Sequence, residues 1–330
     1  VASVEHDTDD SVVITFDPGA EPLPFVHGQH LTLRREIGGV EVRRSYSICS
    51  PVGGPLRVAV RRVAGGAMST WATTELRAGD TVDALAPSGH FTHDLDPAAT
   101  RRYTALAAGS GITPILSIVG TILSAEPMSR VSLVVVNRTS RSTMLLDELH
   151  DLLDRHLGRL RLTFAFTRDD TEGALLSGRP DRARINEWIR VGFLPADADH
   201  AFLCGPLALT TDVADALAAG GMPAGRIHRE LFTADQVGRA HLAPQAVTET
   251  SVAIATGTAR LHGRTTRFDL FEGDSVLDAV QRVRPDAPYS CRSGVCSTCQ
   301  AVLRAGEVDM AVNYGLTAAE VERGYVLTCQ

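Results

Sequence analysis

The spacing of the cysteines constrains the fold of this chain more than any other feature. Three of the six cysteines lie in the short segment CRSGVCSTC, residues 291–299, and a fourth, Cys329, follows far downstream. If all four thiols serve one site, the chain between them must fold back onto the loop. The residues alone leave three interpretations of this pattern, which are disulfides, a zinc site and an iron–sulfur cluster.

The order of these cysteines favours an iron–sulfur cluster. A soluble chain of this size has large cores and does not need disulfides to stay folded. Zinc ligands usually come as two close pairs or together with histidines, whereas the fourth cysteine here stands alone. The spacing C-x4-C-x2-C followed by a distant cysteine is the plant-type pattern of 2Fe–2S ligands. The predicted ligands are Cys291, Cys296, Cys299 and Cys329.

The charged residues exclude several classes of function. The net charge of -7 argues against a protein that binds the phosphate backbone of nucleic acids, which requires basic patches. Every basic residue apart from histidine is an arginine. The sequence therefore contains neither a Walker-type phosphate lysine nor a lysine for Schiff-base chemistry.

Residues 104–125 carry no charge and have the length of a membrane-spanning helix, which is one interpretation of this segment. However, Gly109, Gly111 and Pro114 cluster within it, and this pattern indicates a strand, a tight turn and a helix. The N-terminus lacks the basic and apolar regions of a secretion signal. We therefore expect no membrane insertion and a cytoplasmic protein.

Three blocks follow one another along the 330 residues, a length typical of two or three domains. Residues 1–98 alternate apolar and polar positions between turn residues, which predicts short antiparallel strands in a barrel or sandwich. Residues 99–232 alternate apolar runs with helical segments, which predicts a parallel sheet with flanking helices. Residues 233–247 lack periodicity and are predicted to be a linker. Residues 248–330 hold two predicted strands, a helix and the cysteine loop, and we expect a short tail beyond Gln330.

The first block contains two candidate cofactor motifs. In RRSYSICS, Arg44 is suited to bind a phosphate, Tyr46 to stack on a planar ring and Ser47 to hydrogen-bond a ring nitrogen. A core tyrosine beside a surface arginine gives the same pattern. In VAVRRVAGGAMSTW, two glycines precede a predicted helix start, an arrangement that binds pyrophosphates but also occurs in plain hairpin turns. The residues of this second motif are Gly65, Gly66 and Ser69.

The second block contains a similar glycine turn. The segment ALAAGSGITPILSI predicts a strand, a turn at Gly109 and Gly111, and a helix. Thr113 is a suitable N-cap for this helix and Pro114 a suitable first residue. The helix N-terminus is then free to receive the pyrophosphate of a nicotinamide nucleotide.

Arginines in the second block are candidates for recognising the ribose end of the nucleotide. Arg168 follows a predicted strand in FTRDD, and an arginine suits a 2′-phosphate better than a ribose hydroxyl. Arg138 and Arg179 lie in neighbouring predicted loops. Each arginine taken singly fits an ordinary surface position nearly as well.

Several of these motifs resemble known families. Residues 250–330, with DAPYSC before the cysteine loop and LTC at the end, resemble plant-type ferredoxins, which implies an α+β, β-grasp domain. The R-x-Y-S motif and GQHLTL resemble the flavin domain of the ferredoxin–NADP reductase family, although His27 stands where that family usually has proline. A pyrophosphate loop favours FAD over FMN, because FMN has no pyrophosphate.

The same resemblance implies further active-site residues in the second block. Cys204 of CGP matches the cysteine beside the nicotinamide and flavin. In HRELF, Glu230 resembles the active-site acid of the family, and Phe232 an aromatic residue near the flavin edge. Thr167 and Arg168 take the place of the Ser-Arg pair that recognises the 2′-phosphate of NADPH, so we expect NADPH to be preferred to NADH. Ser47, Cys204 and Glu230 are the implied active-site residues.

The order of flavin barrel, nucleotide domain and ferredoxin domain resembles the reductase components of bacterial multicomponent oxygenases, of the phenylacetyl-CoA epoxidase and ketosteroid hydroxylase types. The resemblance implies an enzyme that passes electrons from NAD(P)H through FAD and a 2Fe–2S cluster to an oxygenase partner. Flavin has to lie between the other two, because a nicotinamide gives two electrons as hydride and the cluster accepts one. A non-oxygenase acceptor such as a desaturase and a non-enzymatic redox sensor are the alternatives.

Overall fold

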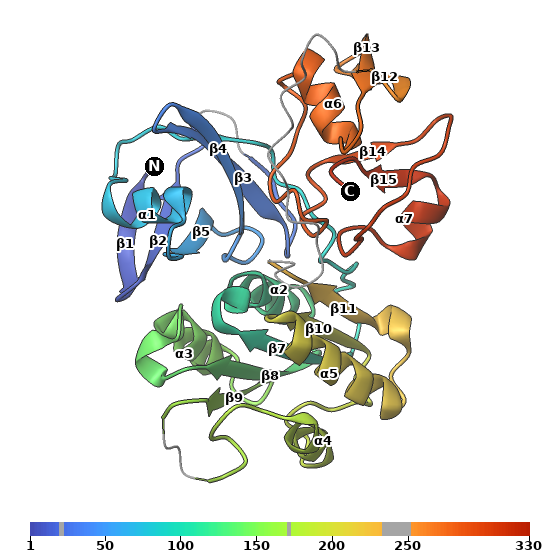
Figure 1. The fold of residues 1–330 in the computed structure, drawn as a ribbon. Helices are drawn as coiled ribbons and strands as arrows, with labels where there is room; N and C mark the ends of the chain where they lie inside the picture. The colour runs from blue at the N-terminus through green and yellow to red at the C-terminus, as the bar shows by residue number, and fades with distance from the viewer. Residues whose placement is uncertain (20–22, 170–172, 233–251) are drawn as a thin grey trace. The chain divides into compact units, whose positions relative to one another are not determined.

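The computed structural model describes residues 1–19, 23–169, 173–232 and 252–330. The chain divides into two compact units, Val1–Phe232 and Thr233–Gln330, which are drawn in Figure 1. The predicted linker, residues 233–247, lies outside the described residues. The domain boundaries inferred from the sequence stay predictions.

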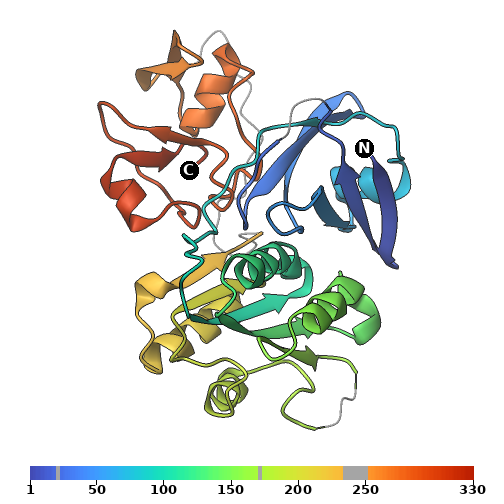
Figure 2. The same ribbon diagram turned by 180° about the vertical axis from the view of Figure 1, so that it is seen from behind.

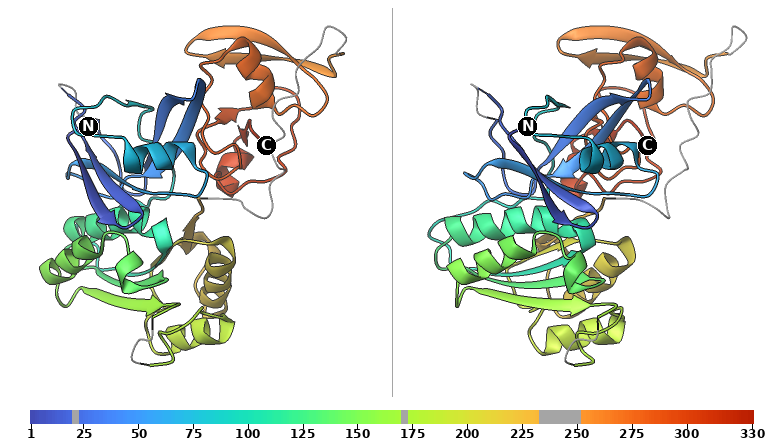
Figure 3. Two further views of the ribbon diagram at one scale, coloured as in Figure 1. Left: turned by 60° about the vertical axis from the view of Figure 1, so that its left-hand side comes forward. Right: turned by 90° about the vertical axis from the view of Figure 1, so that its left-hand side faces the viewer.

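The first part of the N-terminal unit is built from antiparallel strands, as the alternating pattern predicts. Two three-stranded sheets have the orders β1-β2-β5 and β4-β3-β6, and a bridge between Ile48 and Val58 joins the strand ends of the two sheets. Figure 3 shows these strands and helix α1 in profile. The elements are β1 (Ser3–Thr8), β2 (Ser11–Phe16), β3 (His30–Ile37), β4 (Val40–Ser47), β5 (Leu56–Arg61), α1 (Ala67–Thr74) and β6 (Asp83–Ala84).

The core of this barrel comes from the inward faces of its strands and from α1. Ile14, Leu33 and Val58 are completely buried, and Trp71 of α1 packs against the same cluster. Apolar burial of this kind is the main stabilising contribution to such a small antiparallel domain. The barrel thereby holds β4, which carries the R-x-Y-S motif, in a defined position.

The second part of the N-terminal unit is the predicted parallel sheet, and all of its strand pairs are parallel. Its strand order is β11-β10-β7-β8-β9. The elements are β7 (Arg102–Ala108), α2 (Ile112–Ala125), β8 (Arg130–Asn137), α3 (Leu146–Arg155), β9 (Leu160–Phe166), α4 (Arg182–Arg190), β10 (His200–Cys204), α5 (Leu207–Ala219) and β11 (Ile227–Glu230).

Helices cover both faces of this sheet (Figures 1 and 2). Apolar residues of α2 and α3 share one buried cluster with one face, and those of α4 and α5 share another cluster with the opposite face. Because both faces are buried, the strands are nearly continuous apolar runs instead of alternating ones. In such open sheets ligands bind at the carboxyl ends of the strands.

The uncharged residues 104–125 form most of β7, a 3₁₀ turn at Gly109–Gly111 and helix α2, which confirms the strand–turn–helix interpretation. Within the described residues, none of the helices combines the length and the apolar character needed to span a membrane.

The turn also corrects the predicted start of α2. The N-cap is Gly111, and Thr113 and Pro114 are the second and third residues of the helix. The Thr113 hydroxyl donates to the carbonyl oxygen of Ser110 at 3.0 Å and so does not accept from the helix N-terminus. The prediction that Thr113 caps this helix and Pro114 begins it is therefore wrong, because the 3₁₀ turn already brings the chain into helical geometry.

The C-terminal unit has the α+β organisation that the ferredoxin-like pattern implies. A hairpin of β12 and β13 packs against α6, and a short antiparallel pair, β14 with β15, lies beside the cysteine loop. The elements are β12 (Ala255–Leu261), β13 (Arg264–Leu270), α6 (Val276–Val283), β14 (Gln300–Val302), α7 (Ala318–Glu322) and β15 (Tyr325–Leu327).

Candidate active site

The carboxyl ends of β7, β10 and β11 bring the predicted nucleotide residues of the N-terminal unit together. Cys204 ends β10 and pairs in register with Glu230 at the end of β11. A Cβ atom on Gly111 would lie only 2.3 Å from the carbonyl oxygen of Cys204. Glycine is therefore required where the 3₁₀ turn packs on Cys204, and this contact sets the N-terminus of α2 beside the cysteine.

A hydrogen bond links this edge to the barrel. The Ser47 hydroxyl, at the end of β4, donates to Oε2 of Glu230 at 3.3 Å across 183 residues of sequence. Burial raises the pKa of the Glu230 carboxyl to about 8, although the hydrogen bond from Ser47 opposes the rise. At neutral pH Glu230 therefore holds a proton that it can exchange with the Ser47 hydroxyl.

Cys204 is fully buried. Its burial, together with the neighbouring Glu230 carboxyl, raises the pKa of the Cys204 thiol well above its usual range. A neutral thiol of this kind is a small apolar surface and a weak hydrogen-bond donor, and it is not a nucleophile. The arrangement therefore suits the positioning of a bound ring rather than covalent chemistry on sulfur.

The two glycine-preceded helices, α1 and α2, have no side-chain cap at the N-terminus, and α3 and α5 share this feature. Helix α1 has Gly66 as its N-cap and α2 has Gly111, and neither helix has a side-chain hydrogen bond at its N-terminus. The N-caps with a side-chain hydrogen bond are Asp181 of α4, Ser275 of α6 and Thr317 of α7. The first N–H groups of α1 and α2 thus have no side-chain acceptor, which fits the binding of a pyrophosphate at each.

Ser69 orders the glycine loop before α1. Its hydroxyl accepts from the backbone N–H of Val63 at 3.1 Å and donates to the carbonyl oxygen of Gly66 at 3.2 Å. Gly65 has a φ of 72°, a left-handed conformation that favours glycine. The helix begins at Ala67, two residues before Ser69, the predicted start. Ser69 therefore lies inside the first turn and supports the loop from there.

Arg44 and Tyr46 lie on the same face of β4, because side chains alternate along a strand. Arg44 is exposed, and its Nη1 donates to the carbonyl oxygen of Arg43 at 2.7 Å. Tyr46 packs against the barrel core, and burial raises the pKa of its hydroxyl, so the phenol stays neutral. This leaves a cation and an aromatic ring side by side, as the flavin motif requires.

The predicted ribose-end residues lie at the carboxyl ends of β8 and β9. The backbone N–H of Arg168 donates to the carbonyl oxygen of Arg138 at 2.8 Å, and that of Thr167 donates to Asn137 at 2.9 Å. Arg138, Arg168 and Arg179 are all exposed. Among the described residues none of these three guanidinium groups has a hydrogen-bond or ion-pair partner, so their charge is available to a phosphate.

A cluster of histidines that the sequence did not predict lies at the amino ends of β10 and β11, opposite to Cys204 and Glu230. The ring of His93 lies 3.8 Å from that of His200, and Nδ1 of His200 is 3.1 Å from Nε2 of His228. Burial lowers the pKa of His200 and of His228 to about 4, and it also lowers that of His93. The strand pattern HAFLC beside IHRE signals His200 and His228, but His93 comes from a loop and has no local signal.

The four predicted cluster ligands of the C-terminal unit come together through strand pairing. Cys299 precedes β14 and Cys329 follows β15, and the antiparallel pairing of Gln300 with Leu327 brings the two cysteines to the same end. The hydroxyl of Thr328 donates to the carbonyl oxygen of Cys299 at 2.8 Å. The distant fourth cysteine is thereby placed beside the loop that contains the other three.

The loop itself fits a thiolate-bound cluster. Backbone N–H groups point at sulfur, from Ser293 to Cys291 at 3.3 Å and from Cys291 to Cys296 at 3.5 Å. The hydrogen bond between Cys291 and Cys296 lowers the pKa of the Cys291 thiol and raises that of Cys296, so Cys291 is the member of the pair that most readily takes the thiolate form that iron requires. Gly294 has a φ of 77°, and a Cβ atom there would lie 2.8 Å from the carbonyl oxygen of Val312.

All six cysteines, which lie in the described ranges, are free thiols, so the disulfide interpretation is wrong. In the part of the chain that the structure describes, no three His, Cys, Asp or Glu side chains converge on a single ion. The cysteines instead form two hydrogen-bonded pairs, Cys291 with Cys296 and Cys299 with Cys329. Two pairs match the ligand set of a two-iron cluster, in which each iron takes two sulfurs.

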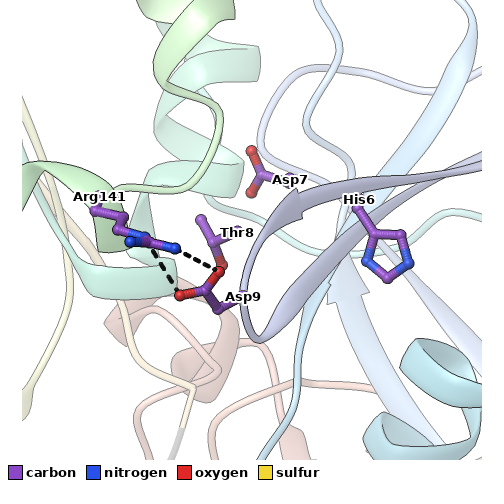
Figure 4. Close-up of a pocket in the computed structure, with 5 residues that line it drawn as sticks. All are labelled: His6, Asp7, Thr8, Asp9 and Arg141. Atoms are coloured by element: carbon purple, nitrogen blue, oxygen red, sulfur yellow. Dashed lines mark hydrogen bonds and ion pairs between the residues drawn. The ribbon is translucent and has the colours of Figure 1, made fainter.

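A surface depression lies at the turn between β1 and β2, where it is lined by His6, Asp7, Thr8, Asp9 and Arg141 (Figure 4). Arg141 forms an ion pair there with Asp9 at 3.4 Å, and both side chains are largely exposed. Nearby, the Asp7 carboxylate accepts from the backbone N–H of Leu145 at 2.9 Å. These contacts join the barrel to the start of α3, and they give the depression a structural role.

Three family models match the chain. They are the oxidoreductase FAD-binding domain over residues 2–93, the oxidoreductase NAD-binding domain over 105–215 and the 2Fe-2S iron-sulfur cluster binding domain over 259–330. Their ranges include the flavin motif, Cys204 and the four predicted cluster cysteines, whereas β11 with Glu230 lies outside them.

Curated relatives match over the whole chain. One component of the 1,2-phenylacetyl-CoA epoxidase from Escherichia coli (strain K12) is 40% identical, covering 100% of this chain and 93% of the relative. The ferredoxin reductase component of 3-ketosteroid-9-alpha-monooxygenase from Mycobacterium tuberculosis is 34% identical, covering 100% of this chain and 91% of the relative.

A solved structure shares the architecture. Phthalate dioxygenase reductase, described as a modular structure for electron transfer from pyridine nucleotides to [2Fe-2S], matches with a TM-score of 0.62 and 26% identity. The match covers 100% of this chain and 92% of that one. The three-part order is therefore common to these proteins.

Proposed function

This chain belongs to the family of FAD- and 2Fe–2S-containing reductase components of oxygenases, and we propose that it accepts hydride at the edge formed by Cys204, Glu230 and Ser47. As a member of this family it passes electrons from NAD(P)H through FAD and a 2Fe–2S cluster to a partner oxygenase. When bound, FAD supplies the step from two-electron to one-electron transfer. A desaturase partner and a non-enzymatic redox sensor are therefore set aside.

One observation carries the proposal for the hydride site, which is the hydrogen bond between Ser47 and Glu230. It joins the end of the flavin motif to the end of β11, where Glu230 pairs with Cys204. The neutral Cys204 thiol provides a close apolar surface for a nicotinamide ring. Glu230 holds a proton within hydrogen-bond distance of the Ser47 hydroxyl. Phe232, 39% exposed and two residues beyond Glu230, covers the flavin edge in this proposal.

The residues that would hold the cofactors follow from the same geometry. Arg44 and the uncapped start of α1 would bind the phosphates of FAD, and Tyr46 would contact its ring. The 3₁₀ turn at Gly109–Gly111 and the start of α2, which includes Thr113 and Pro114, would bind the diphosphate of the nicotinamide nucleotide. Cys291, Cys296, Cys299 and Cys329 would ligate the 2Fe–2S cluster.

We propose a preference for NADPH over NADH. Arg168 and Arg138 place two guanidinium groups without a described partner on neighbouring strand ends, and Thr167 adds a hydroxyl. A 2′-phosphate carries roughly two negative charges near neutral pH. An arginine fork matches its oxygens better than it matches a ribose hydroxyl.

We also propose that the electron acceptor is an oxygenase of the phenylacetyl-CoA epoxidase type. The support is the identity of 40% over the full chain to the matching component of that enzyme, against 34% to the ketosteroid monooxygenase component. We place the protein in the cytoplasm, where reducing conditions keep thiols such as the six free cysteines unpaired.

Absorption spectroscopy of the purified full chain tests the proposed electron path. Both flavin and 2Fe–2S bands should be present, and NADPH should bleach the flavin bands in pre-steady-state measurements. Adding a purified oxygenase of the epoxidase type should restore the oxidised bands under turnover. Flavin bands that stay oxidised with NADPH and with NADH would contradict the proposed hydride site, and absent restoration would contradict the choice of partner.

A further inference from the structure

The carboxyl end of β8 holds a polar group with no role so far. Asn137 is the last residue of β8, and its side chain is only 5% exposed. Among the described residues its amide nitrogen, Nδ2, has no hydrogen-bond partner. Buried amide donors are nearly always paired, because an unpaired one costs folding free energy. An unpaired donor at a ligand-binding edge indicates that a ligand completes it.

The position of Asn137 defines which ligand group lies within reach. Ala108, the last residue of β7, pairs with Val136, so Gly109 begins the 3₁₀ turn beside Asn137 on the neighbouring strand. The turn and β8 are in contact. The start of α2 follows directly, and it has no side-chain cap. Asn137 therefore ends the strand next to the 3₁₀ turn, and the helix that follows this turn has no side-chain acceptor at its N-terminus.

A cation from the barrel adds positive charge at the same place. Nη1 of Arg61 lies 3.9 Å from the position that a Cβ atom would take on Gly109. The other guanidinium nitrogens of Arg61 are engaged, with Nε donating to Asp10 at 3.2 Å and Nη2 donating to the carbonyl oxygen of Ser142 at 2.5 Å. Arg61 is thereby held over the turn, and within the described ranges its Nη1 has no hydrogen-bond partner.

We propose that Asn137 is a binding residue for the diphosphate of the nicotinamide nucleotide, to which its Nδ2 donates a hydrogen bond. This inference rests on the proposed function, because it assumes that the nucleotide binds at the Gly109–Gly111 turn. The diphosphate is a doubly charged anion. An uncapped helix N-terminus, an unpaired amide donor and the guanidinium of Arg61 are the kinds of group that bind such an anion. Because NADH and NADPH share this group, Asn137 contributes affinity without contributing specificity.

The test compares two variants of matched size in the full chain loaded with FAD and cluster. Asn137→Ala removes the donor, whereas Asn137→Ser leaves a cavity of similar volume and keeps a hydroxyl donor. Equilibrium titrations use NADP⁺, NAD⁺ and adenosine 2′-monophosphate, which lacks a diphosphate. A hydrogen bond to a charged group predicts a Kd about tenfold higher for both dinucleotides in Asn137→Ala. The Ser variant should lie between Ala and the parent, and adenosine 2′-monophosphate should bind all three proteins equally.

Thermal unfolding without nucleotide separates binding from a structural role. Because the Asn137 amide donor has no partner in the described part of the free protein, Asn137→Ala should not lower Tm. Thr104→Val is the control, since the Thr104 hydroxyl in β7 is also buried without a partner among the described residues. This variant should leave both dinucleotide Kd values unchanged.

The possible outcomes either support the inference or overturn it. Unchanged Kd values for both dinucleotides in Asn137→Ala overturn it, whether or not Tm falls. Equal Kd values for the Ala and Ser variants overturn the donor role. A loss confined to NADP⁺ also overturns it, because it would move Asn137 to the 2′-phosphate. If the parent itself binds neither dinucleotide, the proposed hydride site fails instead.

Discussion

The cysteine loop of the C-terminal unit and the β10–β11 edge of the N-terminal unit assemble their functional residues in different ways. Three of the four proposed cluster ligands come from nine consecutive residues, and one strand pair brings the fourth beside them. The candidate hydride site instead joins Ser47 to Glu230 across 183 residues and two sheets. When the ligands of a metal centre are close in sequence, their spacing alone predicts the centre. When a site is built from the ends of several strands, the sequence shows only separate short motifs, and their meeting cannot be predicted from any one of them.

The largest expected effect tests whether the two sites are separable. Cys299→Ser should remove the 2Fe–2S bands and leave FAD bound, because the cysteine loop and the flavin motif belong to different units. Loss of groups that merely support metal ligands costs about 10–100-fold, so loss of a ligand should lower reduction of the oxygenase at least about a hundredfold. NADPH should still bleach the flavin at the parent rate in stopped-flow absorption.

Cys49→Ala is the control for this prediction. Cys49 is buried in the N-terminal unit, so its loss should leave the cluster bands intact. Full turnover with the oxygenase in the cluster-free Cys299→Ser variant would contradict the proposed electron path.

The second prediction concerns the candidate hydride site and asks whether it can be impaired without loss of the cluster. Cys204→Ala should slow flavin reduction by on the order of ten- to hundredfold, because a cavity behind the nicotinamide ring loosens its alignment with the flavin. FAD content and cluster bands should stay at parent levels. Pre-steady-state flavin reduction with saturating NADPH measures the effect. An unchanged rate would make Cys204 a buried structural residue only.

The third prediction concerns the exposed residues that are proposed to bind the ribose end of the nucleotide. Arg168→Ala should lower the preference for NADPH by roughly tenfold, the effect of one charged hydrogen bond. The change should appear mainly in KM, because the 2′-phosphate is remote from the reacting ring. Steady-state kinetics with both nucleotides measure the ratio. A parent that prefers NADH, or a ratio unchanged in the variant, would show Arg168 to be an ordinary surface residue.

The fourth prediction uses the raised pKa of Glu230. Below pH 8 the carboxyl is protonated, and above it the carboxylate places a negative charge where hydride must arrive. The rate of flavin reduction should therefore fall by about tenfold as pH rises through 8, equivalent to about 1.4 kcal/mol. Glu230→Gln should abolish this inflection while Cys299→Ser keeps it. An inflection that persists in Glu230→Gln would assign it to another group.

The same shift of Glu230 has a consequence for stability. The folded state binds more protons than the unfolded state between the ordinary pKa of 4.5 and about 8. The contribution of Glu230 to stability is thus fully present below pH 4.5 and is lost as pH rises through 8.

The smallest expected effect contrasts the acid sensitivity of the two units. His200 and His228 have pKa values lowered from 6.5 to about 4, so the unfolded state binds more protons in this range. Their contribution to stability is present above pH 6.5 and is lost as pH falls toward 4. We expect the Tm of the N-terminal unit to drop by about 5 °C across this window.

Calorimetry that resolves the two units checks this prediction. His200→Phe retains a stacked ring against His93 and should make the pH dependence shallower. An equal drop in both units would contradict a role for the buried histidines.

Glycine turns, strand periodicity and cysteine spacing are properties of contiguous residues, and the sequence by itself determined what depends on them. The presence of a parallel sheet, the turn at Gly109–Gly111 and the choice of the four cysteines as proposed cluster ligands all follow from local patterns. The predicted start of α2 was wrong because a threonine directly before a proline is a sequence pattern typical of a helix N-cap. Whether a 3₁₀ turn precedes the helix depends on how Gly111 packs against Cys204.

Only the tertiary structure decided which distant residues meet. The pairing of Cys204 with Glu230, the hydrogen bond from Ser47 and the histidine cluster all require strands from separate segments to lie side by side. Burial sets the pKa of Glu230 and leaves the Asn137 amide unpaired, and burial is a property of the packed fold. Sequence patterns specify the elements through local backbone preferences, whereas desolvation and long-range contacts exist only after those elements have packed together.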